Sequence, residues 1–94
     1  MSSVVRCGLV QAACELSGDR PIPEIKQHMI DKHVKFVEEA AKQGVKILCF
    51  QEIFYGPYFC AEQEIKWYDS AEPMDGPTNT LFAALAKKHD MVIV

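Results

Sequence analysis

The residues best suited to chemistry lie in the segment 45–60, VKILCFQEIFYGPYFC, where a carboxylate follows a short apolar run. Residues 45–51 are typical of a buried strand, and Glu52 comes directly after them. Open α/β sheets place their reactive groups at the carboxyl ends of parallel strands. Aromatic residues in the loop that follows could exclude water from this carboxylate and make it a stronger proton acceptor. These residues are Phe54, Tyr55, Tyr58 and Phe59. Glu52 is therefore the candidate general base.

The same residues also have ordinary structural interpretations. A glutamate at a strand end is compatible with a solvated surface carboxylate, because only desolvation or a charged partner would make it unusual. Tyr58 is compatible with packing as well as with substrate contact. Gln51 could orient Glu52 or could hydrogen-bond along the sheet edge.

The cysteines and histidines do not form a recognisable metal or disulfide pattern. The four cysteines contain no C-x-x-C pair, and the three histidines stand at no ligand-like spacing from them. His28 and His33 are five residues apart, which places them on different faces of a helix. We expect free thiols, with some of the cysteines buried as small hydrophobic residues, and no metal site.

The elements that must position Glu52 alternate between strand and helix. We expect strands at Val4–Ala13, Val45–Gln51 and Met91–Val94, a linker at Glu15–Pro23, a polar stretch at 61–74, and helices at Pro23–Gln43 and from about Thr78 to His89. Gly44 is placed to end the first helix as its C′ residue, and Thr78 is a plausible N-cap of the second. This order predicts parallel strands joined by right-handed crossovers.

Apolar periodicity indicates how these elements pack. The first helix carries one apolar stripe, formed by Ile25, Met29, Ile30, Val34, Val37, Ala40 and Ala41. The strand at 45–51 is apolar on both faces except at Lys46, which predicts a strand covered on both sides.

Composition limits the class of protein. The chain has 94 residues, 49% hydrophobic and 24% charged, as expected for one small globular domain. A net charge of −3 argues against nucleic acid as a partner. The sequence has no apolar run long enough to span a membrane and no secretory signal pattern, so we expect a cytoplasmic location. The last apolar run continues to Val94, so we expect residues 1–94 to be an incomplete α/β domain, cut within a strand.

Several motifs in this order resemble the carbon–nitrogen hydrolase (nitrilase) superfamily. They are Val10-Gln11, the helix end at 38–44, Phe50-Gln51-Glu52, the loop at 55–60 and Asp-Gly-Pro-Thr at 75–78. Within the superfamily, the sequence is similar to the branch that holds β-ureidopropionases and N-carbamoylputrescine amidases. The run from the strand through Gln51-Glu52 to Tyr58-Phe59-Cys60 is the most specific part of the resemblance.

The resemblance implies an α/β fold in which this chain is the N-terminal part of a four-layer αββα sandwich. It also implies a Glu-Lys-Cys triad that hydrolyses N-carbamoyl amines, N-carbamoyl-β-amino acids or related amides, with no cofactor. Glu52 would be the general base and Tyr58 a substrate contact. The triad lysine and the nucleophile would lie beyond Val94, and Cys60 is not that nucleophile. The complete protein would be a homo-oligomer.

Two functions therefore remain open. The first is the N-terminal part of such a hydrolase, inactive by itself because only one residue of the triad is present. The second is a non-catalytic α/β domain that acts by association with a partner or a paralogue. These residues do not specify the exact substrate.

Overall fold

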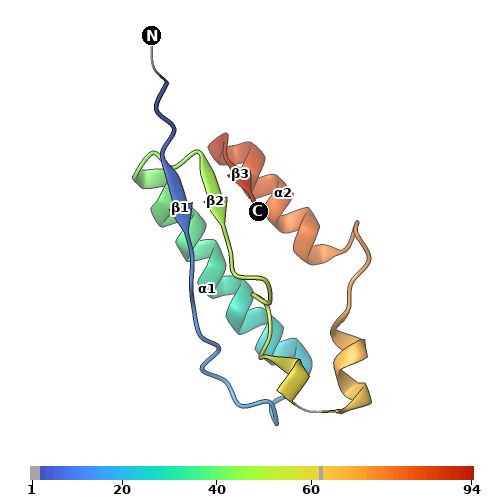
Figure 1. Cartoon of the computed structure of the whole chain (residues 1–94). Coiled ribbons are helices and arrows are strands. Elements are labelled where there is room, and N and C mark those ends of the chain that lie inside the picture. Colours follow the sequence, from blue (N-terminus) through green and yellow to red (C-terminus); the bar gives the residue numbers. More distant parts are fainter. Residues whose placement is uncertain (1–2, 62) are drawn as a thin grey trace.

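Three short parallel strands form the sheet of this protein (Figure 1). The computed structural model describes residues 3–61 and 63–94. The strands β1 (Cys7–Leu9), β2 (Ile47–Cys49) and β3 (Val92–Ile93) lie in the order β1-β2-β3. In register, Cys7 lies opposite Ile47, and Ile47 lies opposite Val92. The structure therefore confirms the expected parallel α/β arrangement.

The strands are shorter than the sequence predicted. Hydrogen bonds continue for a few residues beyond them, as from the Val10 amide to the Cys49 carbonyl at 2.8 Å and from the Phe50 amide to the Val94 carbonyl at 2.7 Å. The other residues of the predicted strand ranges lie outside the three strands. A ladder needs two paired chains, so apolar pattern alone overestimated how far each strand extends.

Two α-helices provide the crossovers. Helix α1 (Ile22–Lys42) has Pro23 in its first turn, and Gly44 follows it with a φ of +75°. This left-handed conformation suits glycine and confirms Gly44 as the residue that ends the helix. Two 3₁₀ helices, η1 (Phe59–Ala61) and η2 (Ile65–Ser70), occupy part of the region between β2 and α2. Glu62, in the predicted polar stretch, lies outside the described residues.

The prediction that Thr78 caps the second helix is wrong. Helix α2 (Pro77–His89) has Gly76 as its N-cap, and Thr78 lies inside the first turn. The Thr78 amide and hydroxyl both donate to the carboxylate of Glu72, at 2.8 and 2.6 Å. A side chain from six residues earlier therefore accepts the helix N-terminal hydrogen bond that an N-cap would have accepted.

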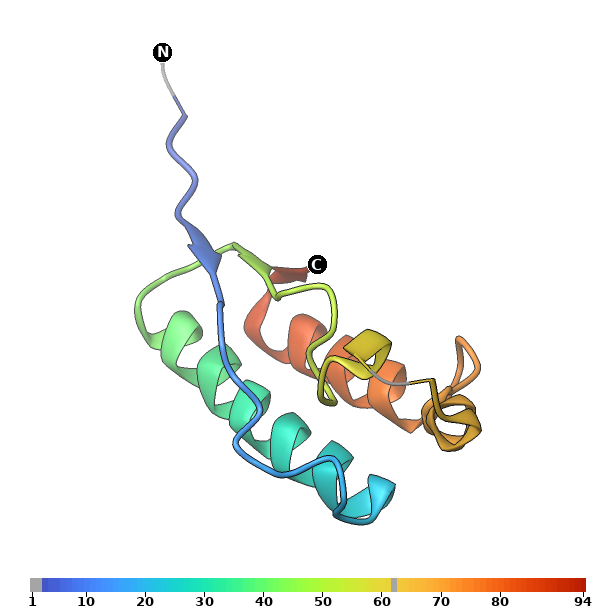
Figure 2. The same ribbon diagram turned by 60° about the horizontal axis from the view of Figure 1, so that its bottom comes forward.

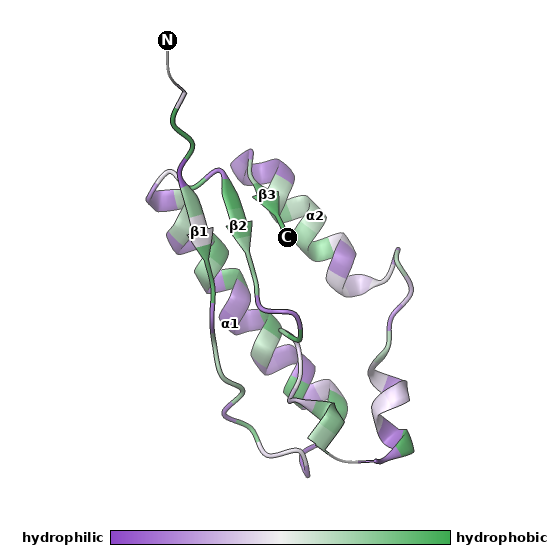
Figure 3. Ribbon diagram, in the orientation of Figure 1, coloured by the Kyte–Doolittle hydropathy of each residue, from purple (hydrophilic) through white to green (hydrophobic). Residues whose placement is uncertain are grey.

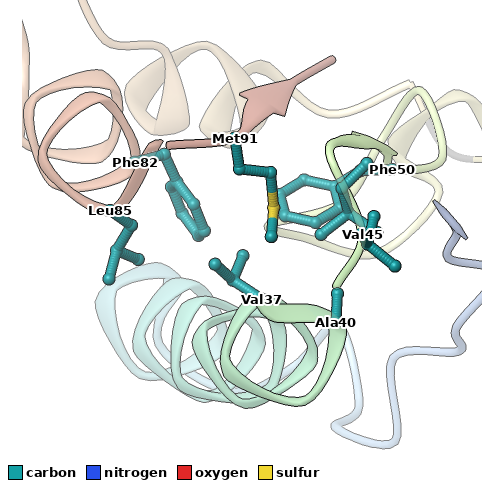
Figure 4. Packing of buried hydrophobic residues seen from close by; sticks show 8 residues of the cluster. Val37, Ala40, Val45, Phe50, Phe82, Leu85 and Met91 are labelled. Carbon is teal, nitrogen blue, oxygen red and sulfur yellow. The ribbon is translucent and has the colours of Figure 1, made fainter. Parts of the chain in front are cut away.

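Both helices pack on the same face of the sheet (Figure 2). The two crossovers step across the sheet in the same direction, and right-handed connections then place both helices on one side. The core lies between this face and the helices (Figure 4). Its buried residues are Val37, Ala40, Val45, Leu48, Phe50, Phe82, Leu85 and Met91.

The opposite face of the sheet is uncovered in the described part of the chain. By register it carries Cys7, Leu9, Ile47, Cys49 and Val92, which we call the open face. Leu9 is 81% exposed, Ile47 38% and Val92 57%, and Figure 3 shows apolar residues along the strands. The expectation that the strand at 45–51 is covered on both sides is therefore wrong for these residues, because the crossover helices cover only one.

Candidate active site

Glu52 lies just beyond the carboxyl end of β2, as the sequence predicted. Glu52 is one of the residues that line a cavity of about 230 Å³, together with Lys26, Tyr55, Phe59 and Trp67. Helix α1 contributes Lys26, the loop after β2 contributes Tyr55, and η2 contributes Trp67. Glu52 itself remains exposed. The described residues thus form a partly apolar cavity beside Glu52, and Glu52 stays in contact with water.

The four aromatic residues expected near Glu52 separate into three environments. Phe54 packs into the core, with its ring centroid 5.1 Å from Phe50 and 5.5 Å from Phe82. Tyr55 and Phe59 line the cavity. Tyr58 is 69% exposed and is not among the described residues that line the cavity. Only two of the four aromatic residues therefore line the cavity beside Glu52.

Lys26 links three parts of the chain beside the cavity. Its ammonium pairs with Glu72 at 2.5 Å, donates to the Ser70 carbonyl at 3.0 Å and lies 5.0 Å from the centroid of the Tyr55 ring. The Lys26 and Glu72 side chains are only 19% and 13% exposed. The charge of Lys26 is already paired, so this lysine is poorly suited to stabilise an oxyanion.

The pKa of Glu72 reflects these contacts. Burial alone would raise it, but the Lys26 ammonium and the two Thr78 donors outweigh burial and lower the pKa to about 2. Glu72 is therefore ionised at neutral pH and holds α1 to the N-terminus of α2.

Sequence reasoning missed a buried polar contact behind Glu52. His33 is fully buried in α1, where its Nδ1 lies 2.7 Å from the Met29 carbonyl oxygen. The side-chain nitrogen of Gln51 lies 3.2 Å from His33 Nε2 and donates to the Ala12 carbonyl at 3.3 Å. His33 lies four residues after Met29 and four residues before Val37 in the sequence. This spacing could have placed His33 in the apolar stripe of the helix.

The cysteines remain free thiols in the structure. Cys60 is exposed in η1 and lines a neighbouring cavity rather than the one that holds Glu52. Among the described residues, no group of three or more His, Cys, Asp or Glu side chains could hold a metal ion. Within residues 3–61 and 63–94, neither helix is long and apolar enough to cross a membrane.

Comparison with known proteins identifies similar sequences. Residues 8–94 match the carbon–nitrogen hydrolase family. A β-ureidopropionase of Arabidopsis thaliana is 37% identical over 91 residues, which are 97% of this chain and 22% of that protein. An N-carbamoylputrescine amidase of Oryza sativa subsp. japonica is 34% identical over 92 residues, 97% of this chain and 28% of that protein. The chain thus spans about a quarter of the length of these relatives.

Proposed function

The chain belongs to the carbon–nitrogen hydrolase family, and from this premise we propose that it forms the N-terminal part of an amidohydrolase acting on N-carbamoyl amines or N-carbamoyl-β-amino acids. Its relatives include proteins named for both kinds of substrate. The observation that carries the proposal is the position of Glu52, beyond the carboxyl end of β2 and on the wall of a cavity.

In the proposed mechanism Glu52 is the general base of a Glu-Lys-Cys triad. It accepts the thiol proton while the sulfur attacks the carbonyl carbon of the amide or carbamoyl group. A lysine stabilises the tetrahedral oxyanion. Its collapse breaks the carbon–nitrogen bond, and the departing ammonia or amine takes the proton that Glu52 accepted. Water then hydrolyses the thioester-type intermediate that remains. Residues outside this 94-residue sequence supply the lysine and the cysteine. Tyr58 contacts the substrate from the loop after β2, and the reaction requires neither a metal nor an organic cofactor.

The proposal includes a fold for the complete domain, the four-layer αββα sandwich. The open face supports it, because an apolar sheet surface of this kind is stabilised when a second sheet packs against it. The substrate cavity would then be completed by loops from the second sheet, which would also exclude water from Glu52.

Ammonia release by the complete product of the reading frame that contains these residues tests the function. We expect release from N-carbamoyl-β-alanine or N-carbamoylputrescine by that product. The isolated 94-residue chain should release none, because the members of a triad act as a unit and two are absent. Activity of the isolated chain that is lost on Cys60→Ser would contradict the assignment of roles.

The open face also favours a second candidate function, that of a non-catalytic domain acting by association with a partner or paralogue. The downstream coding sequence separates the two candidates. A lysine followed by a cysteine at a strand-to-helix turn would support the hydrolase, whereas a stop codon directly after Val94 would support the association domain.

A further inference from the structure

The hydrogen bonds of His33 define which of its ring nitrogens carries the proton. Nδ1 faces the Met29 carbonyl, which can only accept, so the proton lies on Nδ1. In the neutral ring Nε2 is then an acceptor, and it faces the side-chain amide of Gln51. The Ala12 carbonyl lies on the same amide nitrogen, so Gln51 donates to both neighbours. The Met29 carbonyl, His33, the Gln51 side-chain nitrogen and the Ala12 carbonyl thus form a chain in which each donor faces an acceptor. The buried Oε1 of Gln51 has no hydrogen-bond partner among the described residues.

The ring of His33 also packs against the residues on either side of Glu52. Its centroid lies 4.9 Å from that of Phe50 and 5.2 Å from that of Phe54, both in edge-on geometry. Together with the hydrogen bond to Gln51, His33 therefore contacts the chain before and after Glu52. Adjacent Cα atoms are only ~3.8 Å apart, so a shift of Gln51 would move Glu52 as well.

We propose that His33 is a positioning residue for Glu52: its Nε2 acceptor holds the Gln51 amide, and this contact fixes the end of β2 from which Glu52 extends. The inference rests on the proposed function, since the position of Glu52 affects the rate only if Glu52 is the base. The ring nitrogens of His33 are fully buried, and buried polar groups need hydrogen-bond partners. This need gives the contact between His33 and Gln51 a defined geometry.

Two substitutions at position 33 distinguish positioning from packing. His33→Phe keeps an aromatic ring but removes the acceptor, whereas His33→Gln loses the ring but places an acceptor near the position of Nε2. In the complete product of the reading frame, we expect His33→Phe to lower kcat by ~10–100-fold, because geometry at a reacting centre is sensitive to shifts of about 1 Å. We expect His33→Gln to retain kcat within about threefold, with KM nearly unchanged in both.

Matched variants complete the experiment. Gln51→Met should lower kcat at least as much as His33→Phe, because it also removes the hydrogen bond to the Ala12 carbonyl. The double variant should lose no more than Gln51→Met alone, because both substitutions remove the contact between His33 and Gln51. His28→Gln, on the exposed side of α1, is the control. Folding of each variant is checked by circular dichroism. If His33→Phe keeps full kcat, packing alone explains His33 and the proposal is wrong. Loss of kcat in His33→Gln alone would lead to the same conclusion.

Failure of the proposed function gives a different result, since Glu52→Gln would then retain its rate with His33 intact. A second measurement does not require activity. In the ¹⁵N spectrum of the histidine rings, we expect His33 to carry its proton on Nδ1 and its Nε2 resonance to shift in Gln51→Met. A ring protonated on Nε2, or an Nε2 resonance that ignores Gln51, would overturn the positioning contact.

Discussion

At position 52 the chain places a single exposed carboxylate on the wall of a partly apolar cavity. If it is the base, Glu52→Gln keeps its shape but cannot accept a proton. In the complete product of the reading frame we expect kcat to fall by ~10²–10⁴-fold with little change in KM. Glu52→Asp should also lose much of the rate, because it withdraws the carboxylate by one methylene and geometry at a reacting centre is sensitive to shifts of about 1 Å. Steady-state kinetics of both variants provide the measurement.

Glu38→Gln is a suitable control, since Glu38 is an exposed glutamate on α1, away from the cavity lining. Its substitution should leave kcat nearly unchanged. It should change the free energy of unfolding by no more than about 0.5 kcal/mol. Folded Glu52 variants that keep more than about half of the wild-type kcat would show that this residue is not the base.

At the scale of elements, the Glu72 carboxylate joins α1 to the start of α2. Its pKa of about 2 lies below the ordinary 4.5, so the ionised form stabilises the fold above pH 4.5. This contribution is lost as the pH falls from 4.5 towards 2. Glu72→Gln should therefore reduce the free energy of unfolding at neutral pH by about 1–3 kcal/mol, because the partly buried ammonium of Lys26 loses its anionic partner and keeps only the Ser70 carbonyl. Denaturant unfolding of the complete product of the reading frame across this pH range measures the effect.

The variant and the wild type should converge in stability at the acid end of that range. Some acid sensitivity should remain in Glu72→Gln, because the Lys32 and His28 contacts of Glu15 also lower the pKa of that exposed carboxylate to about 2. A difference between variant and wild type that stays constant from pH 4.5 to pH 2 would mean that the charge of Glu72 does not stabilise the junction.

For the molecule as a whole, the open face and the outer edges of β1 and β3, which pair with no other strand within residues 3–61 and 63–94, favour association of the isolated chain. We expect oligomers or aggregates in light scattering at micromolar concentration. Val92→Lys places a charge on the open face and should reduce this association. Ile65→Lys, at an exposed apolar position of η2 away from the sheet, is the matched control and should have a smaller effect.

A sharp monomeric species with cooperative thermal unfolding would contradict this expectation. An equal reduction by Val92→Lys and Ile65→Lys would show that added charge, and not the open face, governs association.

The sequence by itself determined the order of the elements and the place of the candidate base. Apolar spacing located α1 within one residue at each end, and a glycine at position 44 marked where the helix ends because glycine tolerates a φ of +75°. The motif around Glu52 indicated the family that residues 8–94 match. These features could be predicted because each depends on neighbours within a few residues.

Only the tertiary structure decided which groups meet across the fold. Three pairs of residues are distant in sequence and meet only when the crossover helices pack on the sheet. They are Lys26 and Glu72, His33 and Gln51, and Phe54 and Phe82. Apolar residues on both faces of the strand at 45–51 suggested cover on both sides, yet the handedness of two crossovers left one face open. Local pattern encodes how apolar a position is, whereas its partner depends on the path of the whole chain.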